Sequence, residues 1–476
     1  MSQDKASRRL TRRRLLGTGL AAGGASVLAA CGATPTPQTV VETVVVTTEV
    51  EKVVEQTVEV EKVVEKEVVV EVTPAPSTLA GEVNVWVFPQ GENDLDALWT
   101  PLNARFQQEY PGISLNIELL PWGGRREKML TAYAAGEAPD AAYVNSDTIS
   151  LFGTNDVLAP LDDVLAQEAW DDLFGDLQAG LIWEGKRLMF PALLIGTGHL
   201  YNKGLMSEIG LDPEKPPYTW DELRAAGAAS ATSGYFLTSW NTMDWANTWV
   251  SIVWQAGGTT FSEDMTKALL DTEPAYEALN FAVEMFQNGW VPKEGAVGSD
   301  TESSAVSAVN YWIEGRSTLS GWGNPDITTN TRTQAPEIDF GLVPVWMNKR
   351  QVCNGGAGCW GVFKGSKAPE ATAAWLNWLI QPEQQGFYGS VTKFAPPRRS
   401  AWDYWAAEPL PKEFVAMRID LLEMNQDTTY FWQEGKVICA PYFQAAVLGY
   451  QTVEQALAGA QAELQQLVDE FNASRA

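Results

Sequence analysis

Residues 81–120 read GEVNVWVFPQGENDLDALWTPLNARFQQEYPGISLNIELL, and this stretch decides the fold class. Residues 81–88 alternate between apolar and polar side chains and then run apolar, which predicts a strand. Residues 97–110 have helical spacing and end before a Pro-Gly pair, and residues 113–120 show a second strand pattern. A strand, a helix and a strand in this order predict a parallel sheet with crossover helices, so the fold class is α/β.

The same alternation continues beyond this stretch. Residues 125–137 have helical spacing, and residues 139–145 form a short apolar strand. Gly136 is predicted to end that helix, because glycine readily adopts the left-handed conformation of a helix C-terminus. Thr219 is predicted to begin another helix, because threonine ahead of acidic residues is a good N-cap. Further helices are predicted at residues 371–388, 413–425 and 453–474.

Residues 1–30 have the composition of an export signal. Three arginines, residues 12–14, precede an apolar run too short to span a bilayer, and they resemble the twin-arginine signal of bacteria. The sequence LAAC at residues 28–31 resembles the bacterial lipobox, whose cysteine is lipidated after cleavage. We therefore predict a lipid on Cys31 that holds the exported protein at the outer face of the cytoplasmic membrane.

Residues 31–78 differ in composition from everything that follows. Prolines flank a run of valine and glutamate in which VEKVVE occurs at residues 50–55 and again at residues 60–65. The glutamates keep this run solvated, and the valines favour an extended chain or a short coiled-coil stalk over a globular core. We predict a spacer between the lipid and the globular part of the protein.

The composition excludes several classes of function. The formal net charge of −27 argues against nucleic acid as a partner, because such binding depends on lysine and arginine neutralising phosphates. The single histidine, His199, and the lack of a second close cysteine pair argue against zinc. The sequence has no G-x-x-x-x-G-K-S/T loop, so any ATPase would be a separate chain. We predict neither a metal nor a cofactor.

Export would allow disulfide bonds between the remaining cysteines. Cys353 and Cys359, in the sequence CNGGAGC, are predicted to form a bridge around a short glycine-rich loop. Cys439 would then be free and buried.

Several segments resemble, in order, the segments of one protein family. They are AAGEAPDAAYVNSD (134–147), GKRLMFPALLIGTGHLYNKGLMSEIGL (185–211), PYTWDEL (217–223), YWIEGRSTLSGWGNPDI (311–327) and GGAGCWGVFKGSKAPEATAAWLNWL (355–379). Together they are similar to the extracellular solute-binding proteins of ATP-driven importers, typified by maltose and oligosaccharide binders. The resemblance covers nearly all of residues 80–476.

The resemblance implies a two-lobed periplasmic-binding-protein fold of the class II type, with a hinge and a ligand cleft between the lobes. By analogy, the lobes would comprise residues 79–194 and 350–398 (lobe I) and residues 198–345 and 403–476 (lobe II). The connecting stretches would lie near residues 195–197, 346–349 and 399–402. Sheets of this kind bind ligands at the carboxyl ends of their parallel strands.

Tryptophan is unusually abundant, with 20 in the chain. One face of a pyranose ring exposes C–H groups that pack on an aromatic ring, while the sugar hydroxyls need polar partners. Trp249 and Trp254 are predicted to be core residues, because apolar neighbours share their helix face. Trp240 and Trp245 bracket a polar turn, and each is either a core residue or a ligand contact.

The predicted ligand contacts are aromatic and polar residues near strand ends and in loops. Asn145, Asp147 and Trp322 are candidates because the family pattern places a polar cluster and a stacking aromatic there, and a structural role is the alternative for every candidate. The complete set is Trp86, Gln90, Glu92, Trp122, Asn145, Asp147, Trp240, Trp245, Trp322, Trp360 and Trp432.

These observations predict a monomer that captures a sugar or oligosaccharide and presents it to a membrane permease driven by a separate ATPase, without enzymatic activity. One alternative is the same fold with a polyamine, glycerol phosphate, peptide or other small solute as cargo. The other is a secreted glycosidase that uses Asp162-Asp163 or Asp171-Asp172. Catalysis needs two carboxyls facing one bond, and sequence neighbours usually point apart, so we predict that these pairs are solvated surface.

Overall fold

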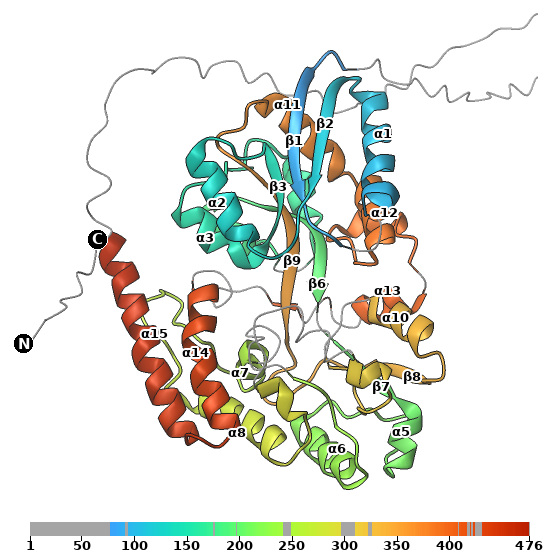
Figure 1. Ribbon diagram of the computed structural model, residues 1–476, viewed down its shortest axis with the longest axis vertical. Coiled ribbons are helices and arrows are strands. Elements are labelled where there is room, and N and C mark those ends of the chain that lie inside the picture. Colours follow the sequence, from blue (N-terminus) through green and yellow to red (C-terminus); the bar gives the residue numbers. More distant parts are fainter. Residues whose placement is uncertain are drawn as a thin grey trace, which may run out of the picture. The chain divides into compact units, whose positions relative to one another are not determined.

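The computed structural model describes most of the chain from Ser77 onward (Figure 1). The predicted leader, Cys31 and nearly all of the predicted spacer lie outside the described residues. Contacts group Pro76–Ala476 into one compact unit. The described residues are 77–90, 94–174, 177–196, 198–240, 249–296, 310–321, 326–407, 409–416, 419, 422–423 and 431–475.

The central sheet contains the strands that the sequence predicts. β1 (Ala80–Val87) lies between β2 (Gly112–Leu119) and β3 (Ala141–Asn145) and runs parallel to both. α1 (Thr100–Glu109) connects β1 to β2, and α2 (Arg125–Ala135) connects β2 to β3. The prediction of a parallel sheet with crossover helices is confirmed. So is the end of α2 at Gly136, whose φ is 74°.

β9 (Cys353–Val362) extends this sheet as an antiparallel strand. It pairs with β3 and with β6 (Phe190–Gly196), and its first two residues pair with β10 (Leu422–Glu423). The prediction that this glycine-rich segment is a loop is therefore wrong. At least one of its glycines serves packing within the sheet, because a Cβ at Gly358 would overlap the hydroxyl of Tyr143 on β3.

The predicted disulfide between Cys353 and Cys359 is also wrong. Both cysteines lie on the extended strand β9, both are buried, and neither is in a disulfide bond. A strand rises about 3.3 Å per residue, so their Cα atoms are about 20 Å apart, whereas a disulfide needs less than about 7 Å. Cys439 is free and buried, as predicted.

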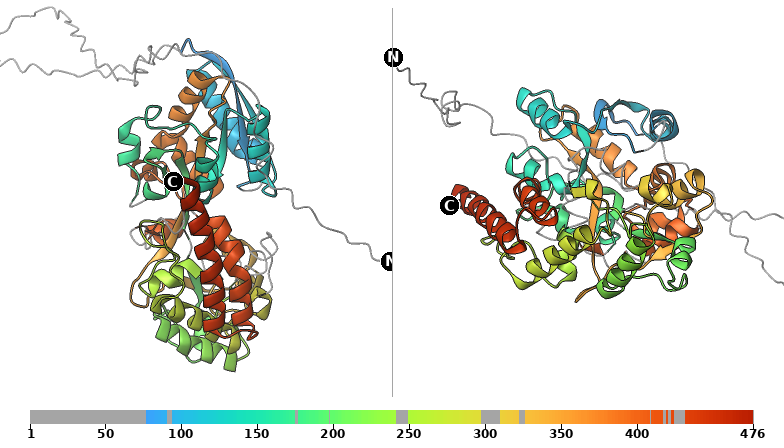
Figure 2. Two further views of the ribbon diagram at one scale, coloured as in Figure 1. Left: turned by 90° about the vertical axis from the view of Figure 1, so that its left-hand side faces the viewer. Right: turned by 60° about the horizontal axis from the view of Figure 1, so that its bottom comes forward.

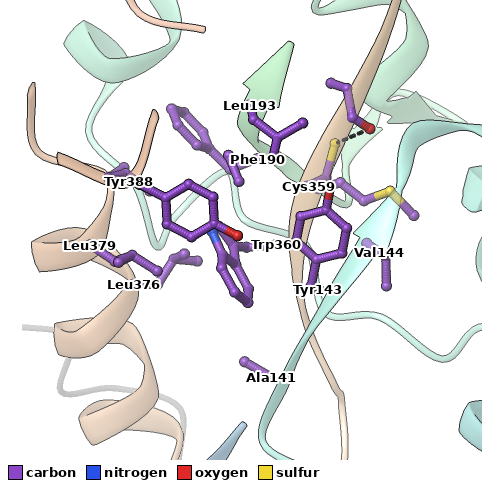
Figure 3. Close-up of a cluster of buried hydrophobic side chains, with 14 of the residues drawn as sticks. Ala141, Tyr143, Val144, Phe190, Leu193, Cys359, Trp360, Leu376, Leu379 and Tyr388 are labelled. Atoms are coloured by element: carbon purple, nitrogen blue, oxygen red, sulfur yellow. Dashed lines mark hydrogen bonds between the residues drawn. The ribbon is translucent and has the colours of Figure 1, made fainter. Parts of the chain in front are cut away.

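The first hydrophobic core packs against this sheet (Figure 3). Val83, Val85 and Val87 enter it from β1, since alternate residues of a strand share a face. Trp360 enters it from β9 and meets Trp375 of α11 (Pro369–Leu379) edge to face, with ring centroids 5.3 Å apart. Strands from distant parts of the sequence therefore share one interior.

The helix predicted at residues 371–388 is two helices. α11 ends at Leu379, and α12 (Pro382–Thr392) begins with a proline in its first turn. Proline has no backbone N–H, and it disfavours helical geometry in the residue before it, so the first helix ends ahead of Pro382.

A second hydrophobic core lies among helices from the middle and the end of the chain. α15, the predicted final helix, is confirmed, and Figure 2 shows it packed along α14. The helices of this core are α6 (Trp220–Thr232), α7 (Ser251–Gln255), α8 (Glu273–Gln287), α14 (Trp432–Val447) and α15 (Val453–Arg475).

Two further predictions for this region are confirmed. Thr219 caps α6, because its side chain accepts the backbone N–H of Glu222 while the Glu222 carboxylate accepts the backbone N–H of Thr219. Trp249 and Trp254 belong to the second core, where they are 3% and 0% exposed.

The other described elements are short. α13 ends well before residue 425, so the predicted helix at residues 413–425 is too long, and Leu422–Glu423 form β10 instead. The remaining elements are α3 (Ile149–Thr154), α4 (Gln167–Asp171), α5 (Lys203–Glu208), α10 (Asp326–Gln334), α13 (Pro409–Ala416), β4 (Ile182–Trp183), β5 (Lys186–Arg187), β7 (His199–Asn202), β8 (Phe340–Val343), η2 (Leu95–Trp99), η3 (Ser146–Thr148), η4 (Ala179–Leu181), η6 (Lys293–Ala296) and η7 (Arg399–Asp403).

The chain leaves the main sheet between β6 and β7, because β7 pairs with β8 in a separate two-stranded sheet. The exact residues of each lobe stay a prediction. Among the described residues, no helix combines the length and the apolar character that crossing a membrane requires.

Candidate functional site

The carboxyl ends of β1, β2 and β3 meet at one edge of the sheet. The register pairs Val87 with Leu119, the last residues of β1 and β2, and Trp86 with Ala142 in β3. Polar and aromatic residues follow each strand at this edge. We call Gln90, Trp122, Arg126, Asn145 and Asp147 the strand-end cluster.

Trp122 is half-buried and fixed in orientation. Its Nε1 donates to the backbone carbonyl of Pro89 at 2.8 Å, and its ring stacks on Phe88 with centroids 5.1 Å apart. The guanidinium of Arg125 lies 4.7 Å from the ring centroid. A sugar that stacked on this ring would meet a preoriented aromatic surface and would share it with Arg125 or displace it.

One side chain of the cluster carries a buried atom without a hydrogen-bond partner among the described residues, Oδ1 of Asn145. The carboxylate of Asp94 accepts the backbone N–H of Gln90. A buried polar atom without a partner costs about 1–3 kcal/mol. This acceptor suits a hydroxyl group, which can donate to it.

Tyr143 of β3 lies beside these residues. Its ring meets Trp122 edge to face, with centroids 5.9 Å apart. Burial raises the pKa of the Tyr143 hydroxyl well above its ordinary value, and a hydrogen bond with Gln90 opposes this increase in part. The hydroxyl therefore stays protonated and contributes no charge to the cluster.

Arg126 and Asp147 form an ion pair within the cluster. Nη2 of Arg126 lies 2.9 Å from Oδ2 of Asp147, and their side chains are 24% and 23% exposed. The two charges offset each other. Arg126 is not among the residues predicted from the sequence, although a signal was present: arginines in the first turn of a helix oppose the helix dipole and so indicate another role.

Trp86 is not brought together with the strand-end cluster. As the second-last residue of β1, it points to the face opposite Val85 and Val87. There, Nζ of Lys128 lies 4.6 Å from the centroid of its ring. Trp86 and α2 line a groove that includes no residue of the strand-end cluster.

Trp360 and Trp240 are core residues, so their predicted direct contact with a ligand does not fit the structure. Trp360 is 1% exposed, and its ring meets Tyr143 edge to face at 5.7 Å. Figure 3 shows it among the side chains of the first core. Trp240 is 5% exposed, packs on Trp346 at 5.6 Å and lines a small apolar cavity in the second core.

Four candidates cannot be placed. Glu92, Trp245 and Trp322 lie outside the described residues. Trp432 begins α14, but its side chain lies outside the described part of the structure.

The carboxylate pairs considered for a glycosidase include one structural anchor. The prediction that Asp172 is solvated surface is wrong, because its side chain is 19% exposed and accepts from Nε of Arg398 at 2.8 Å. Burial acts to raise the pKa of Asp172, but hydrogen bonds from Ser400 and Arg398 outweigh it and lower the pKa below its ordinary value. Asp162 lies 3.9 Å from Nε of Arg187 in a more exposed pair.

The sequence is similar to known binding proteins. The profile of the family described as bacterial extracellular solute-binding protein matches residues 90–386. The diacetylchitobiose-binding protein DasA of Streptomyces coelicolor is 23% identical over 317 residues, which cover 64% of this chain and 71% of DasA.

Solved structures of sugar-binding proteins share the fold. The cyclic α-maltosyl-1,6-maltose-binding protein of Arthrobacter globiformis superposes with a TM-score of 0.69 at 22% identity, over 82% of this chain and 100% of that chain. The sugar-binding protein MalE of Xanthomonas citri gives a TM-score of 0.70 at 21% identity, over 83% of this chain and 98% of that chain. The protein therefore has the two-lobed periplasmic-binding-protein fold.

Proposed function

Because the chain belongs to the family of bacterial extracellular solute-binding proteins, we propose that it captures a sugar or oligosaccharide at the strand-end cluster. It delivers this cargo to a membrane permease that a separate ATPase drives. The observation that carries the choice of cargo is the pairing of an unsatisfied acceptor with an indole: Oδ1 of Asn145 lacks a partner among the described residues, and Trp122 meets Tyr143 of the same strand.

The chemistry of the cluster supports an uncharged, hydroxylated ligand. A sugar hydroxyl can donate to Oδ1 of Asn145, which removes the cost of a buried acceptor without a partner. The apolar face of the sugar ring can pack on Trp122. The ion pair of Arg126 with Asp147 leaves these two residues with no net charge to attract an ionic cargo.

The relatives support the same class of cargo. DasA is named for diacetylchitobiose, and the Arthrobacter globiformis protein is named for a cyclic maltosyl-maltose. An affinity in the micromolar range corresponds to about −8 kcal/mol, which one stacked ring and a few hydrogen bonds can supply.

Titration calorimetry of the full chain tests the proposal. The ligands are maltose, diacetylchitobiose, a polyamine and glycerol phosphate, and we expect binding of at least one sugar. Asn145→Ala should weaken that binding about tenfold, because one hydrogen bond in a dry site contributes about 1.5 kcal/mol. Asn280→Ala is the matched control, because Asn280 is an exposed residue of α8 that bonds only within its helix.

Two other outcomes would overturn part or all of the proposed function. Binding of the polyamine or of glycerol phosphate alone would overturn the sugar assignment and leave the family intact. Release of reducing ends from oligosaccharides would overturn the assignment as a binding protein.

We also propose that the mature protein is a monomer anchored by a lipid on Cys31, which is supported by the LAAC sequence at residues 28–31. Expressed in a bacterium, the natural chain should sediment with membranes and incorporate labelled palmitate. Cys31→Ser should abolish the labelling and release the protein. Labelling that persists in this variant would contradict the assignment.

A further inference from the structure

The groove beside Trp86 is a second concave surface, separate from the strand-end cluster. It has a volume of about 440 Å³, within the range of small-molecule sites. Its floor is the half-buried indole of Trp86 on β1, and one wall is α2. The proposed function gives this groove no role.

The wall of the groove follows one face of α2. Lys128, Thr131, Ala132 and Ala135 line it, and their spacing of three and four residues places them in one row along the helix. The two alanines keep the groove open, because a larger side chain at either position would occupy it. Ala135 is exposed, so the opening faces solvent.

The protein itself places an ammonium group on this indole. Nζ of Lys128 lies 4.6 Å from the centroid of the Trp86 ring and 3.6 Å from Oε1 of Glu118. Glu118 pairs with Trp86 in the register of β1 and β2. Both partners of the ion pair are about half exposed, at 46% and 53%, so the contact can exchange with an outside group. A cation over the face of an indole is attracted by the ring quadrupole.

Carboxylates outnumber cations around the groove. Glu127 and Glu137 line it and are exposed, and Glu118 lies beside Lys128. The floor is aromatic and suits the C–H face of a pyranose, while the carboxylates suit a positive charge and the hydroxyls around it. A ligand that matches both features is a sugar ring with a protonated amine.

We propose that this groove is a second saccharide site, which binds a glucosamine-type amino sugar through Trp86. The ligand ammonium takes the position of the Lys128 ammonium between the indole face and Glu118, and Glu127 and Glu137 accept from its hydroxyls. The site acts independently of cargo capture at the strand-end cluster.

Calorimetry of the full chain with glucosamine, and with glucose as the neutral analogue, tests this site. Glucosamine should bind more tightly than glucose. Ala135→Phe fills the groove and should abolish the glucosamine signal. Ala134→Phe is the matched control, because Ala134 is exposed on α2 and does not line the groove. Asn145→Ala should leave the signal unchanged, which separates this site from cargo capture.

The Lys128→Ala variant distinguishes a ligand-binding groove from one that serves only the fold. Removing the competing ammonium should raise the affinity for glucosamine about threefold, the effect of one exposed cation–π contact. Lys215→Ala removes the same charge from a side chain that is 84% exposed and paired with Asp212, and it should change nothing. Binding that survives Ala135→Phe, or that falls in Lys128→Ala, would overturn the proposal and leave the proposed function standing.

Discussion

The two ends of β3 contrast in how their polar side chains are satisfied. Asp140, just before the strand, is 3% exposed, and its two carboxylate oxygens accept from Asn84, Ser366, Lys367 and Ala368. Asn145, the last residue of the strand, has a buried Oδ1 without a partner among the described residues. The fold satisfies the carboxylate of Asp140, whereas it leaves the acceptor of Asn145 available at the strand ends, where parallel sheets bind ligands.

The indoles show the same contrast. Trp360, opposite the middle of β3, is surrounded by aromatic edges such as those of Tyr143 and Trp375. Trp122 and Trp86 instead have cations, Arg125 and Lys128, over their rings. Exposure separates them: Trp122 and Trp86 are partly exposed, so a ligand can reach their rings, whereas the ring of Trp360 is enclosed.

The largest expected effect is at Trp360 of β9, which pairs with the middle of β3. Trp360→Ala should lower the free energy of unfolding by about 3–5 kcal/mol, because it leaves a large cavity in the first core. Urea unfolding measures this loss. Tyr450→Ala is the control, because Tyr450 is 79% exposed and its loss should change stability by less than about 0.5 kcal/mol. Equal losses in the two variants would break the comparison.

Asp140→Asn should have the next largest effect. Burial acts to raise the pKa of Asp140, but hydrogen bonds from Ser366 and from the backbone amides of Asn84, Lys367 and Ala368 outweigh it and lower the pKa below its ordinary value. The amide of asparagine would turn an N–H toward some of these donors, so we expect a loss of about 2 kcal/mol in urea unfolding. Sugar affinity of the folded variant should stay unchanged. An affinity loss as large as that of Asn145→Ala would contradict the contrast.

Much of this fold follows from local sequence pattern. The alternation in β1 and the capping box at Thr219 are local, so sequence alone predicts them correctly. β9 is different, because its glycines suggest a loop until the position of Tyr143 shows why Gly358 cannot carry a side chain. The wrong disulfide has the same origin, because closeness in sequence becomes distance along an extended strand.

The sequence predicts the position of the candidate site but not all of the residues that form it. Strand order places Gln90, Trp122 and Asn145 at one edge of the sheet, and the structure agrees. Trp360 carries the same side chain as Trp122, and the sequence around it does not show that Tyr143 and Trp375 enclose it. Burial depends on neighbours distant in the sequence, so composition could supply the candidates but could not sort them.

The contribution of Asp140 to stability, and with it the contrast between the ends of β3, should depend on pH. Because the folded-state pKa of Asp140 is lowered, its contribution to stability is present above the unfolded pKa, near 3.9, and is lost as pH falls through the lower folded pKa. The stability gap between the natural chain and Asp140→Asn should therefore narrow below about pH 4. Urea unfolding at pH 7, 5, 4 and 3 measures it. A gap that stays constant with pH would mean that Asp140 acts through packing alone.

The smallest effect on stability is expected at the open end of β3. Asn145→Ala removes a buried acceptor that has no partner among the described residues, so the free energy of unfolding should not fall and can rise by about 1 kcal/mol. The same substitution should weaken sugar binding about tenfold, as in the calorimetric test above. Loss of affinity without loss of stability is the signature of a side chain kept for its ligand. A stability loss comparable with that of Asp140→Asn would show instead that Asn145 serves the fold, and the two ends of the strand would then be alike.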